Sequence, residues 1–198
     1  MFKNKLLLAV LGISIVGIMF YSLDTEKDYT SIAVAERADY KENMLTLEDS
    51  PIKDVRQFTD FSYFPADPKW VIQADFVATT TNKTFQFIMT DSSSTTLPKL
   101  GEATFKWNGE KVTVHIFDEE KTFLLPFRDA TNGQTTYGGG RYINIPKENL
   151  SGSTLTIDFN TAHNFYCAYN EKYVCPIPPV ENTLKLAVEA GEKTFKDQ

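Results

Sequence analysis

The sequence predicts a mainly β protein: an antiparallel β-barrel or β-sandwich of about eight strands, preceded by an N-terminal transmembrane or signal-anchor helix and a short amphipathic helix. Three observations point to this class. Short segments rich in β-branched and aromatic residues recur at hairpin spacing, Asn108-Gly109 is a strong hairpin signal, and no segment resembles a βαβ unit. The 198-residue chain divides into an anchor (1–27), a helical spacer (28–50) and a β-rich domain (51–198).

Eight segments carry the strand pattern. Residues 71–77 and 84–89 alternate between apolar and polar side chains, which is typical of strands with one buried face. Asn108-Gly109 separates 101–107 from 111–117, and a tight hairpin turn needs positive φ at both of its central positions. The remaining predicted strands are 122–127, 141–145, 154–159 and, after a proline-rich bend, 183–188.

The N-terminal segment predicts membrane attachment. Residues 6–23 form an apolar run without charge, and Lys3 and Lys5 precede it. Eighteen helical residues span about 27 Å, which is just enough to cross a bilayer core. The lysines are expected to stay in the cytoplasm, so we expect a single-pass inner-membrane protein whose domain faces the periplasm or extracytoplasmic side. A cleavable signal peptide is the alternative, although Phe20 and Tyr21 crowd the cleavage site.

Residues 30–47 predict the short helix. Ile32, Glu36 and Tyr40 fall at helical spacing among good helix formers, and Pro51 lies beyond the end. The segment is polar enough to lie against the domain, and a spacer between the domain and the membrane is the alternative.

The charge balance excludes one class of partner. Lys3 and Lys5 are the only charged residues before position 24, so the 20 basic residues of the chain leave 18 after that point, against 26 acidic residues and a net charge of −8. Such a surface repels nucleic acid, and no basic cluster with interleaved aromatic residues occurs. We therefore expect no nucleic-acid partner.

Two cysteines, Cys167 and Cys175, suggest a disulfide bond if the domain lies in an oxidising compartment. Closing such a short loop would stabilise the fold by about 2–3 kcal/mol, and two buried thiols are the alternative. A zinc site needs two further ligands, and the chain has only two histidines, His115 and His163. We expect neither a metal nor a cofactor.

Two stretches, 127–142 and 157–182, are dense in polar residues and glycine. From them we take side chains and backbone groups suited to a polar or anionic ligand: Arg128, Thr131, Asn132, Gly138, Gly139, Gly140, Arg141 and Asn160. Candidate catalytic residues are Asp129, Tyr137 and Asp158, which could act as acids or bases.

Each candidate also has a purely structural interpretation. The three glycines could present N–H groups to an anion, or could turn the chain before Arg141. Arg141 could bind a ligand carboxylate or phosphate, or form a buried ion pair with Asp129 or Asp158. Asp158 and Asn160 point to one face of an extended chain, which suits a pocket floor or a turn that ends the strand. The segment 129–132 could equally be a turn held by side-chain-to-backbone hydrogen bonds.

These motifs follow one another in a distinctive order. The runs are F-R-D-A-T-N-G-Q-T-T-Y-G-G-G-R-Y, D-F-N, C-A-Y and C-P-I-P-P-V-E-N, followed by Ala190-Gly191-Glu192. In this order the chain resembles the DUF1684 family over about residues 51–193. The resemblance implies a shared fold and a shared site, and it supplies no activity. Thr135 and His163 stand where family members often carry Glu and Tyr, so His163 is not expected to be a general base.

Three functions are consistent with the sequence. The first is a membrane-anchored, extracytoplasmic module that binds a small polar or anionic ligand. The second is a carboxylate-dependent hydrolase or isomerase, in which Asp129 and Asp158 share the acid and base roles and Tyr137 donates a proton. The third is a structural cell-envelope protein whose motifs serve only the fold. We favour the binding module.

Overall fold

The structure, a computed structural model, describes residues 28–195 except 53, 55, 57, 81 and 82. Its main feature is a sheet of eight antiparallel strands, which confirms the predicted β class. The strands are β1 (Val71–Ala78), β2 (Thr84–Ile88), β3 (Ser94–Trp107), β4 (Glu110–Asp118), β5 (Thr122–Phe127), β6 (Arg141–Pro146), β7 (Leu150–Ser151) and β8 (Thr154–Asp158). Short 3-10 helices are η1 (Pro68–Trp70), η2 (Lys147–Asn149), η3 (Phe159–Thr161), η4 (Tyr166–Ala168) and η5 (Val180–Asn182).

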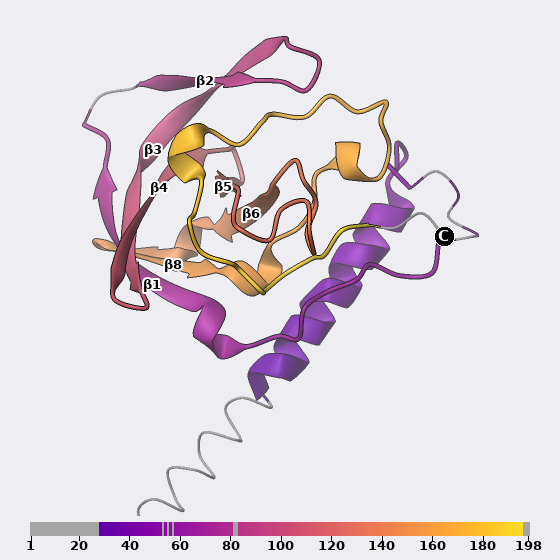
Figure 1. Ribbon diagram of the computed structural model, residues 1–198, viewed down its shortest axis with the longest axis horizontal. Coiled ribbons are helices and arrows are strands. Elements are labelled where there is room, and N and C mark those ends of the chain that lie inside the picture. The colour runs from indigo at the N-terminus through magenta and orange to yellow at the C-terminus, as the bar shows by residue number, and fades with distance from the viewer. Residues whose placement is uncertain (1–27, 53, 55, 57, 81–82, 196–198) are drawn as a thin grey trace, which may run out of the picture.

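The strand order is β6-β5-β4-β3-β1-β8-β7, and β2 pairs with the first half of β3. The sheet is not closed, so β6 and β7 are its two ends; Figure 1 shows the strands from β6 across to β8. The β3–β4 hairpin turns at Asn108 and Gly109, whose φ angles are +50° and +86°. The sequence prediction for this turn is therefore confirmed.

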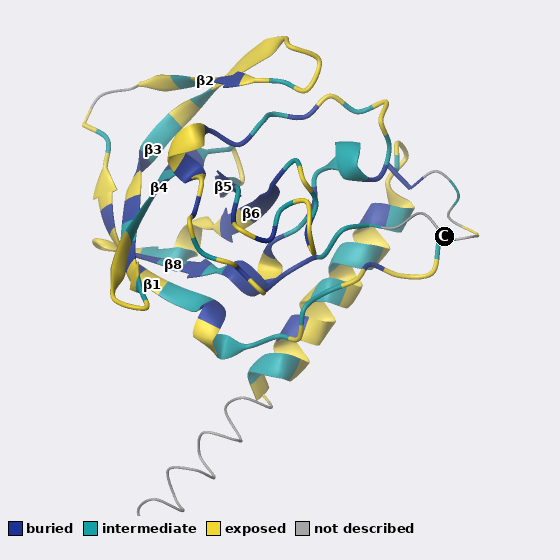
Figure 2. Ribbon diagram, viewed as in Figure 1, coloured by how far each residue is buried: buried dark blue, intermediate teal, exposed yellow. Residues whose placement is uncertain are grey.

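The main hydrophobic core lies between one face of the sheet and the C-terminal segment that crosses it (Figure 2). Leu184 and Val188 from that segment join buried residues of six strands, such as Val114 and Ile143. At one end of the core, the rings of Trp70 and Trp107 stack with their centroids 4.2 Å apart. The C-terminal segment therefore covers this face of the sheet and completes the core.

Residues 183–188 do not form the predicted strand. Thr183 makes only an isolated bridge with Arg128. Two further backbone bonds tie the segment to the loop after β5: Leu184 N–H donates to the Arg128 carbonyl, and Ala130 N–H donates to the Leu186 carbonyl. The alternating pattern reflects burial of Leu184 and Val188 against the sheet. An apolar alternation reports one buried face and does not require a hydrogen-bonded ladder.

A helix covers residues 28–46 of the described chain, close to the predicted 30–47, and lies against the domain (Figure 1). Ala33, Arg37, Tyr40 and Met44 turn toward the domain at helical spacing, and Ala33 and Met44 are buried. No helix among the described residues is long and apolar enough to span a membrane. The predicted anchor at 6–23 lies outside them.

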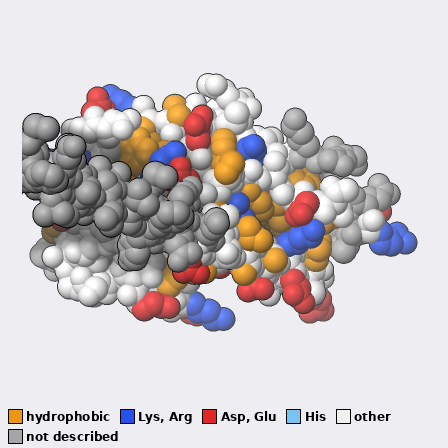
Figure 3. Space-filling model, turned by 90° about the horizontal axis from the view of Figure 1, so that it is seen from below, with side chains coloured by type: hydrophobic (Ala, Val, Ile, Leu, Met, Phe, Trp, Pro, Cys, Tyr) orange, Lys and Arg blue, Asp and Glu red, His pale blue; other side chains and the backbone are white. Residues whose placement is uncertain are grey.

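The face of the molecule seen from below shows acidic and basic side chains interspersed with apolar ones (Figure 3). Ion pairs on the surface include Lys41 with Asp60 at 3.3 Å and Lys69 with Asp67 at 2.6 Å. Such exposed pairs contribute little to stability, typically about 0–1 kcal/mol each.

The two cysteines do not form the predicted disulfide bond in this structure: Cys167 and Cys175 are both free. They are nevertheless neighbours, because the Cys167 N–H donates a hydrogen bond to the Cys175 Sγ at 3.2 Å.

Candidate functional site

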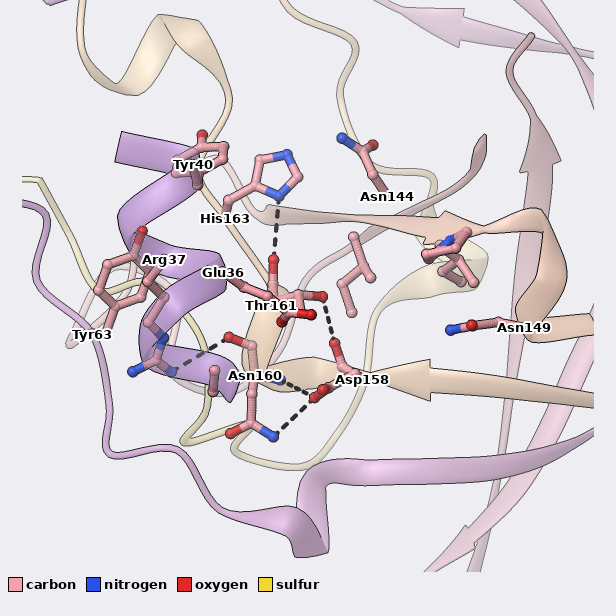
Figure 4. A pocket seen from close by; sticks show the side chains of 14 residues that line it. Glu36, Arg37, Tyr40, Tyr63, Asn144, Asn149, Asp158, Asn160, Thr161 and His163 are labelled. Atoms are coloured by element: carbon pink, nitrogen blue, oxygen red, sulfur yellow. Dashed lines mark hydrogen bonds between the residues drawn. The ribbon is translucent and has the colours of Figure 1, made fainter. Parts of the chain in front are cut away.

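A pocket of about 390 Å³ lies between the helix at 28–46 and the ends of β6 and β8 (Figure 4). Several separate parts of the chain supply its lining, in which residues with polar groups outnumber purely apolar residues although most of the lining surface is apolar. The lining residues are Ala33, Glu36, Arg37, Tyr40, Tyr63, Ile143, Asn144, Ile145, Pro146, Asn149, Asp158, Asn160, Thr161 and His163. Two residues that the sequence singled out, Asp158 and Asn160, are among them.

Asp158, the last residue of β8, forms the floor of the pocket with Asn160. One carboxylate oxygen accepts hydrogen bonds from the Asn160 N–H at 2.8 Å and from its side-chain amide at 2.9 Å. The other accepts from the Tyr29 hydroxyl at 2.6 Å. The Asn160 amide also bonds both backbone groups of Asp67. Asp158 and Asn160 therefore form a turn that ends β8 and also line the pocket.

Arg37 forms part of the helix side of the pocket. Its terminal nitrogens donate to the Phe64 carbonyl at 3.1 Å and to the Asn160 carbonyl at 3.4 Å. Its guanidinium carbon lies 4.5 Å from the centre of the Tyr63 ring. The Arg37 Nε is buried and has no hydrogen-bond partner among the described residues. This side chain is thus held in place while its buried Nε–H donor remains unused.

Glu36 places a second carboxylate at the pocket, from the helix side opposite Asp158 (Figure 4). Glu36 is an exposed residue, but partial desolvation at the pocket and the negative charge of Asp158 raise its pKa above the ordinary value. A raised pKa makes a carboxyl a better proton donor near neutral pH. The pocket therefore combines two carboxyl groups in unlike surroundings.

His163 contributes a neutral ring to the pocket. Its centroid lies 5.5 Å from that of Tyr40, and its Nδ1 lies 3.4 Å from the Thr161 carbonyl. Burial lowers the pKa of His163 to about 4, so the imidazole is uncharged at pH 7. The charged groups of the lining are then Glu36, Asp158 and Arg37, which leaves an excess of negative charge.

A buried polar cluster lies next to Tyr40. One carboxylate oxygen of Glu192 accepts from the Asn164 N–H at 2.8 Å and from the Tyr169 hydroxyl at 2.7 Å. Burial raises the pKa of Glu192 to about 7. The Tyr40 hydroxyl is buried, without a hydrogen-bond partner among the described residues, and Glu192 helps to raise its pKa. Tyr40 connects this cluster to the pocket, because its side chain lines the pocket and feels the charge of Glu192.

Arg141, a predicted ligand-binding residue, lies in the core and not in the pocket. Its guanidinium bonds Asp129 at 2.7 Å and the carbonyls of Val188 at 2.8 Å, Ala190, and Glu192 at 3.3 Å. The side chains of Arg141 and Asp129 are both fully buried. Of the two carboxylates expected to pair with Arg141, Asp129 does so and Asp158 does not.

The loop before Arg141 is built by the other predicted residues. Asp129 accepts hydrogen bonds from the N–H and the hydroxyl of Thr131, and Asn132 bonds the Asp129 N–H at 2.6 Å and the Tyr137 carbonyl at 2.8 Å. Gly140 has a φ of +102°, and a Cβ there would lie 2.8 Å from the Phe127 carbonyl. The segment 129–132 is therefore a side-chain-supported turn, and Gly140 allows two loops to touch.

The remaining candidates lie apart from the pocket. The Tyr137 hydroxyl lies 4.0 Å from the Cys167 Sγ. The backbone of Arg128 pairs with Asn182 and Leu184, and its side-chain Nε is buried without a partner among the described residues. Gly138 is exposed and Gly139 is half-buried. None of these residues lines the pocket.

The helix residues of the pocket were missed by the sequence reasoning. Glu36 and Arg37 lie in a polar helix, where charged residues usually face water. The signal that could have found Arg37 is its spacing, because it lies on the same helix face as Ala33 and Met44. Among the described residues, no group of three or more His, Cys, Asp or Glu side chains could hold a metal ion.

The comparisons with known proteins agree with the family resemblance. The solution NMR structure of the uncharacterized protein from gene locus rrnAC0354 of Haloarcula marismortui is 34% identical in sequence, with a TM-score of 0.68. The match covers 85% of this chain and 95% of that one. No curated protein matches. The model of a protein family of unknown function, DUF1684, matches residues 56–193, which is well over half of the chain. The chain therefore belongs to the DUF1684 family.

Proposed function

We propose that this protein is a membrane-anchored, extracytoplasmic module that binds a small polar ligand in the pocket between the helix and the sheet. The observation that carries the proposal is the convergence of Glu36, Arg37, Asp158 and Asn160 on one cavity of about 390 Å³. That volume falls within the range of about 300–1,000 Å³ that is typical of small-molecule sites. The sequence supports the location through the apolar run at 6–23 and the lysines before it.

The charges of the lining favour an uncharged ligand that carries hydroxyl groups. Glu36 and Asp158 would accept hydrogen bonds from hydroxyls, and the amides of Asn144 and Asn149 can both donate and accept. The Tyr40 and Tyr63 rings offer flat apolar surface beside them. An anionic ligand is disfavoured, because it would add negative charge to a pocket in which desolvation and the charge of Asp158 already raise the pKa of Glu36. A sugar-like ligand fits these groups better than a carboxylate or phosphate.

The test is a binding experiment on the full-length chain with neutral and N-acetylated monosaccharides, followed by ligand-observed NMR. We expect saturation transfer from the protein to at least one sugar. Replacing Asn144, an exposed side chain of the lining, with alanine should weaken that binding about tenfold, the loss expected for a hydrogen bond of about 1.4 kcal/mol. Thr95→Ala, an exposed residue of β3 outside the pocket, is the control.

Native mass spectrometry of protein purified from an oxidising compartment adds a second measurement. A stoichiometric extra mass that disappears in Asn144→Ala would support the proposal and identify the ligand class. A bare protein mass, together with no NMR transfer from any sugar, would contradict the sugar-like ligand and favour the structural envelope role.

A carboxylate-dependent hydrolase is the second candidate, and the raised pKa of Glu36 opposite Asp158 favours it. In this version Glu36 is the acid and Asp158 the base, in place of the Asp129 and Asp158 pair that the sequence suggested. Glu36→Gln should abolish the hydrolysis of aryl glycosides, while Glu42→Gln, on an exposed position of the same helix, should not. Equal rates in these two variants would exclude this chemistry for the pocket.

A further inference from the structure

The two free cysteines are neighbours, and neither of them lines the pocket. Cys167 sits on η4, and its N–H donates to the Cys175 Sγ at 3.2 Å. Cys175 is fixed by Thr90, which accepts a hydrogen bond from the Cys175 N–H at 3.0 Å and donates its own N–H to the Cys175 carbonyl at 2.9 Å. Because both residues are held in place, the two thiols remain neighbours.

The two thiols are not equivalent. Cys167 is half-buried and can be reached from solvent, whereas Cys175 is buried. The Tyr137 hydroxyl lies 4.0 Å from the Cys167 Sγ and can donate to it. Hydrogen bonds from the Cys175 thiol and from Tyr137 stabilise the thiolate of Cys167 and lower its pKa to about 7. The same thiol-to-thiol contact and burial raise the pKa of Cys175.

We propose that Cys167 and Cys175 are a redox-active dithiol that exchanges with small-molecule disulfides, with Cys167 as the attacking thiol and Cys175 as the resolving thiol. In the first step the Cys167 thiolate attacks a disulfide R–S–S–R, forms a mixed disulfide and releases one thiolate, RS⁻. In the second step Cys175 gives up its proton to the RS⁻ released in the first step and attacks the Cys167 sulfur, which forms the Cys167–Cys175 bond and releases the second RS⁻; this RS⁻ takes up a proton from water. Two protein thiols are oxidised, and one small disulfide is reduced to two thiols.

The division of roles follows from access and from chemistry. The attacking thiol must meet the incoming disulfide, which only the solvent-reached Cys167 can do. An attacking thiol works best when its pKa lies near the ambient pH, which is the case for Cys167. The resolving thiol needs only to reach the sulfur of Cys167, and the buried Cys175 is its neighbour. A purely structural pair would not need one of its two residues to stay partly exposed.

The experiment treats the reduced full-length chain with oxidised glutathione and follows the products by mass spectrometry. We expect the wild type to lose two hydrogen atoms and retain no glutathione. Cys175→Ser should instead accumulate one glutathione on Cys167. Cys167→Ser should react at least about tenfold more slowly, because its only thiol is buried and has a raised pKa.

Alkylation by iodoacetamide provides a second readout, which does not require replacement of either cysteine. At pH 7 we expect Cys167 to react about tenfold faster than a thiol of ordinary pKa, which is mostly protonated there. Tyr137→Phe should slow this reaction, and Tyr173→Phe, whose hydroxyl bonds the Asp49 carbonyl, should not. A wild type that stays a dithiol in oxidised glutathione would overturn the proposal. So would a disulfide that is reduced only on unfolding, or a Cys175→Ser variant without glutathione on Cys167.

Discussion

The pH dependence of folding stability should depend strongly on one buried carboxyl group, that of Glu192. Burial raises its pKa from an ordinary 4.5 to about 7, although Asn164 and Tyr169 donate hydrogen bonds to it. A group whose pKa is higher in the folded state stabilises folding fully below its unfolded pKa. That contribution is lost as the pH rises through the folded pKa.

The size of the effect follows from the two pKa values. The span from 4.5 to about 7, at about 1.4 kcal/mol per pH unit, corresponds to about 3 kcal/mol. Between about pH 4 and pH 8, the wild type should therefore lose about 3 kcal/mol of unfolding free energy through this group. Glu192→Gln keeps the shape and cannot ionise, so this part of the pH dependence should vanish.

Urea unfolding at a series of pH values measures this difference. Tryptophan fluorescence should report the transition, because Trp70 and Trp107 are stacked in the core. Glu189→Gln, three positions earlier and exposed, is the matched control and should follow the wild type. If the stability of Glu192→Gln changes with pH as that of the wild type does, the carboxyl is not the source and the reasoning fails.

Three further predictions concern the buried network, and one concerns the pocket. Arg141→Ala should lower the unfolding free energy by about 3–5 kcal/mol, because it leaves the Asp129 carboxylate buried and unpaired; thermal melting would reveal this. Asn182→Ala should cost about 3 kcal/mol or more in urea unfolding, because its side chain satisfies three backbone groups of two strands. Gly191→Ala should cost at least about 1 kcal/mol in the same assay, since φ is +74° and a Cβ would lie 2.5 Å from the Ala162 carbonyl. NMR titration of His163, assigned with His163→Asn, should give a midpoint near pH 4, and a midpoint near 6.5 would show an exposed, uncoupled ring.

The strands of the sheet core could be predicted from sequence because each has one buried face. The pattern in 71–77 led to β1 within one residue, and the turn at Asn108-Gly109 led to the second half of β3 and to β4. The first half of β3, residues 94–100, was missed because it is exposed or only half-buried; residues 94–98 of it pair with β2. Strand order is a tertiary property: β1 pairs with β8, about eighty residues away, and no local pattern encodes that.

The candidate site was predictable only in part, for a related reason. Asp158 and Asn160 stand out because their spacing places both side chains at one strand end. Glu36 and Arg37 become site residues only because the helix packs on the sheet, and a charged residue in a polar helix gives no sign of this in sequence. Arg141 drew attention as a charged residue beside glycines. Whether such a residue binds a ligand or a partner in the core depends on contacts that local sequence does not contain.

The hydrogen bonds of the Arg141 guanidinium also bear on the order in which the fold can be completed. All eight strands are complete at residue 158, yet three of the carbonyls that receive the guanidinium belong to Val188, Ala190 and Glu192. Because the chain is synthesised from its N-terminus, all eight strands are made before the three carbonyls that compensate the buried charge of Arg141. The buried guanidinium of Arg141 therefore has its full set of partners only once residues up to Glu192 are in place.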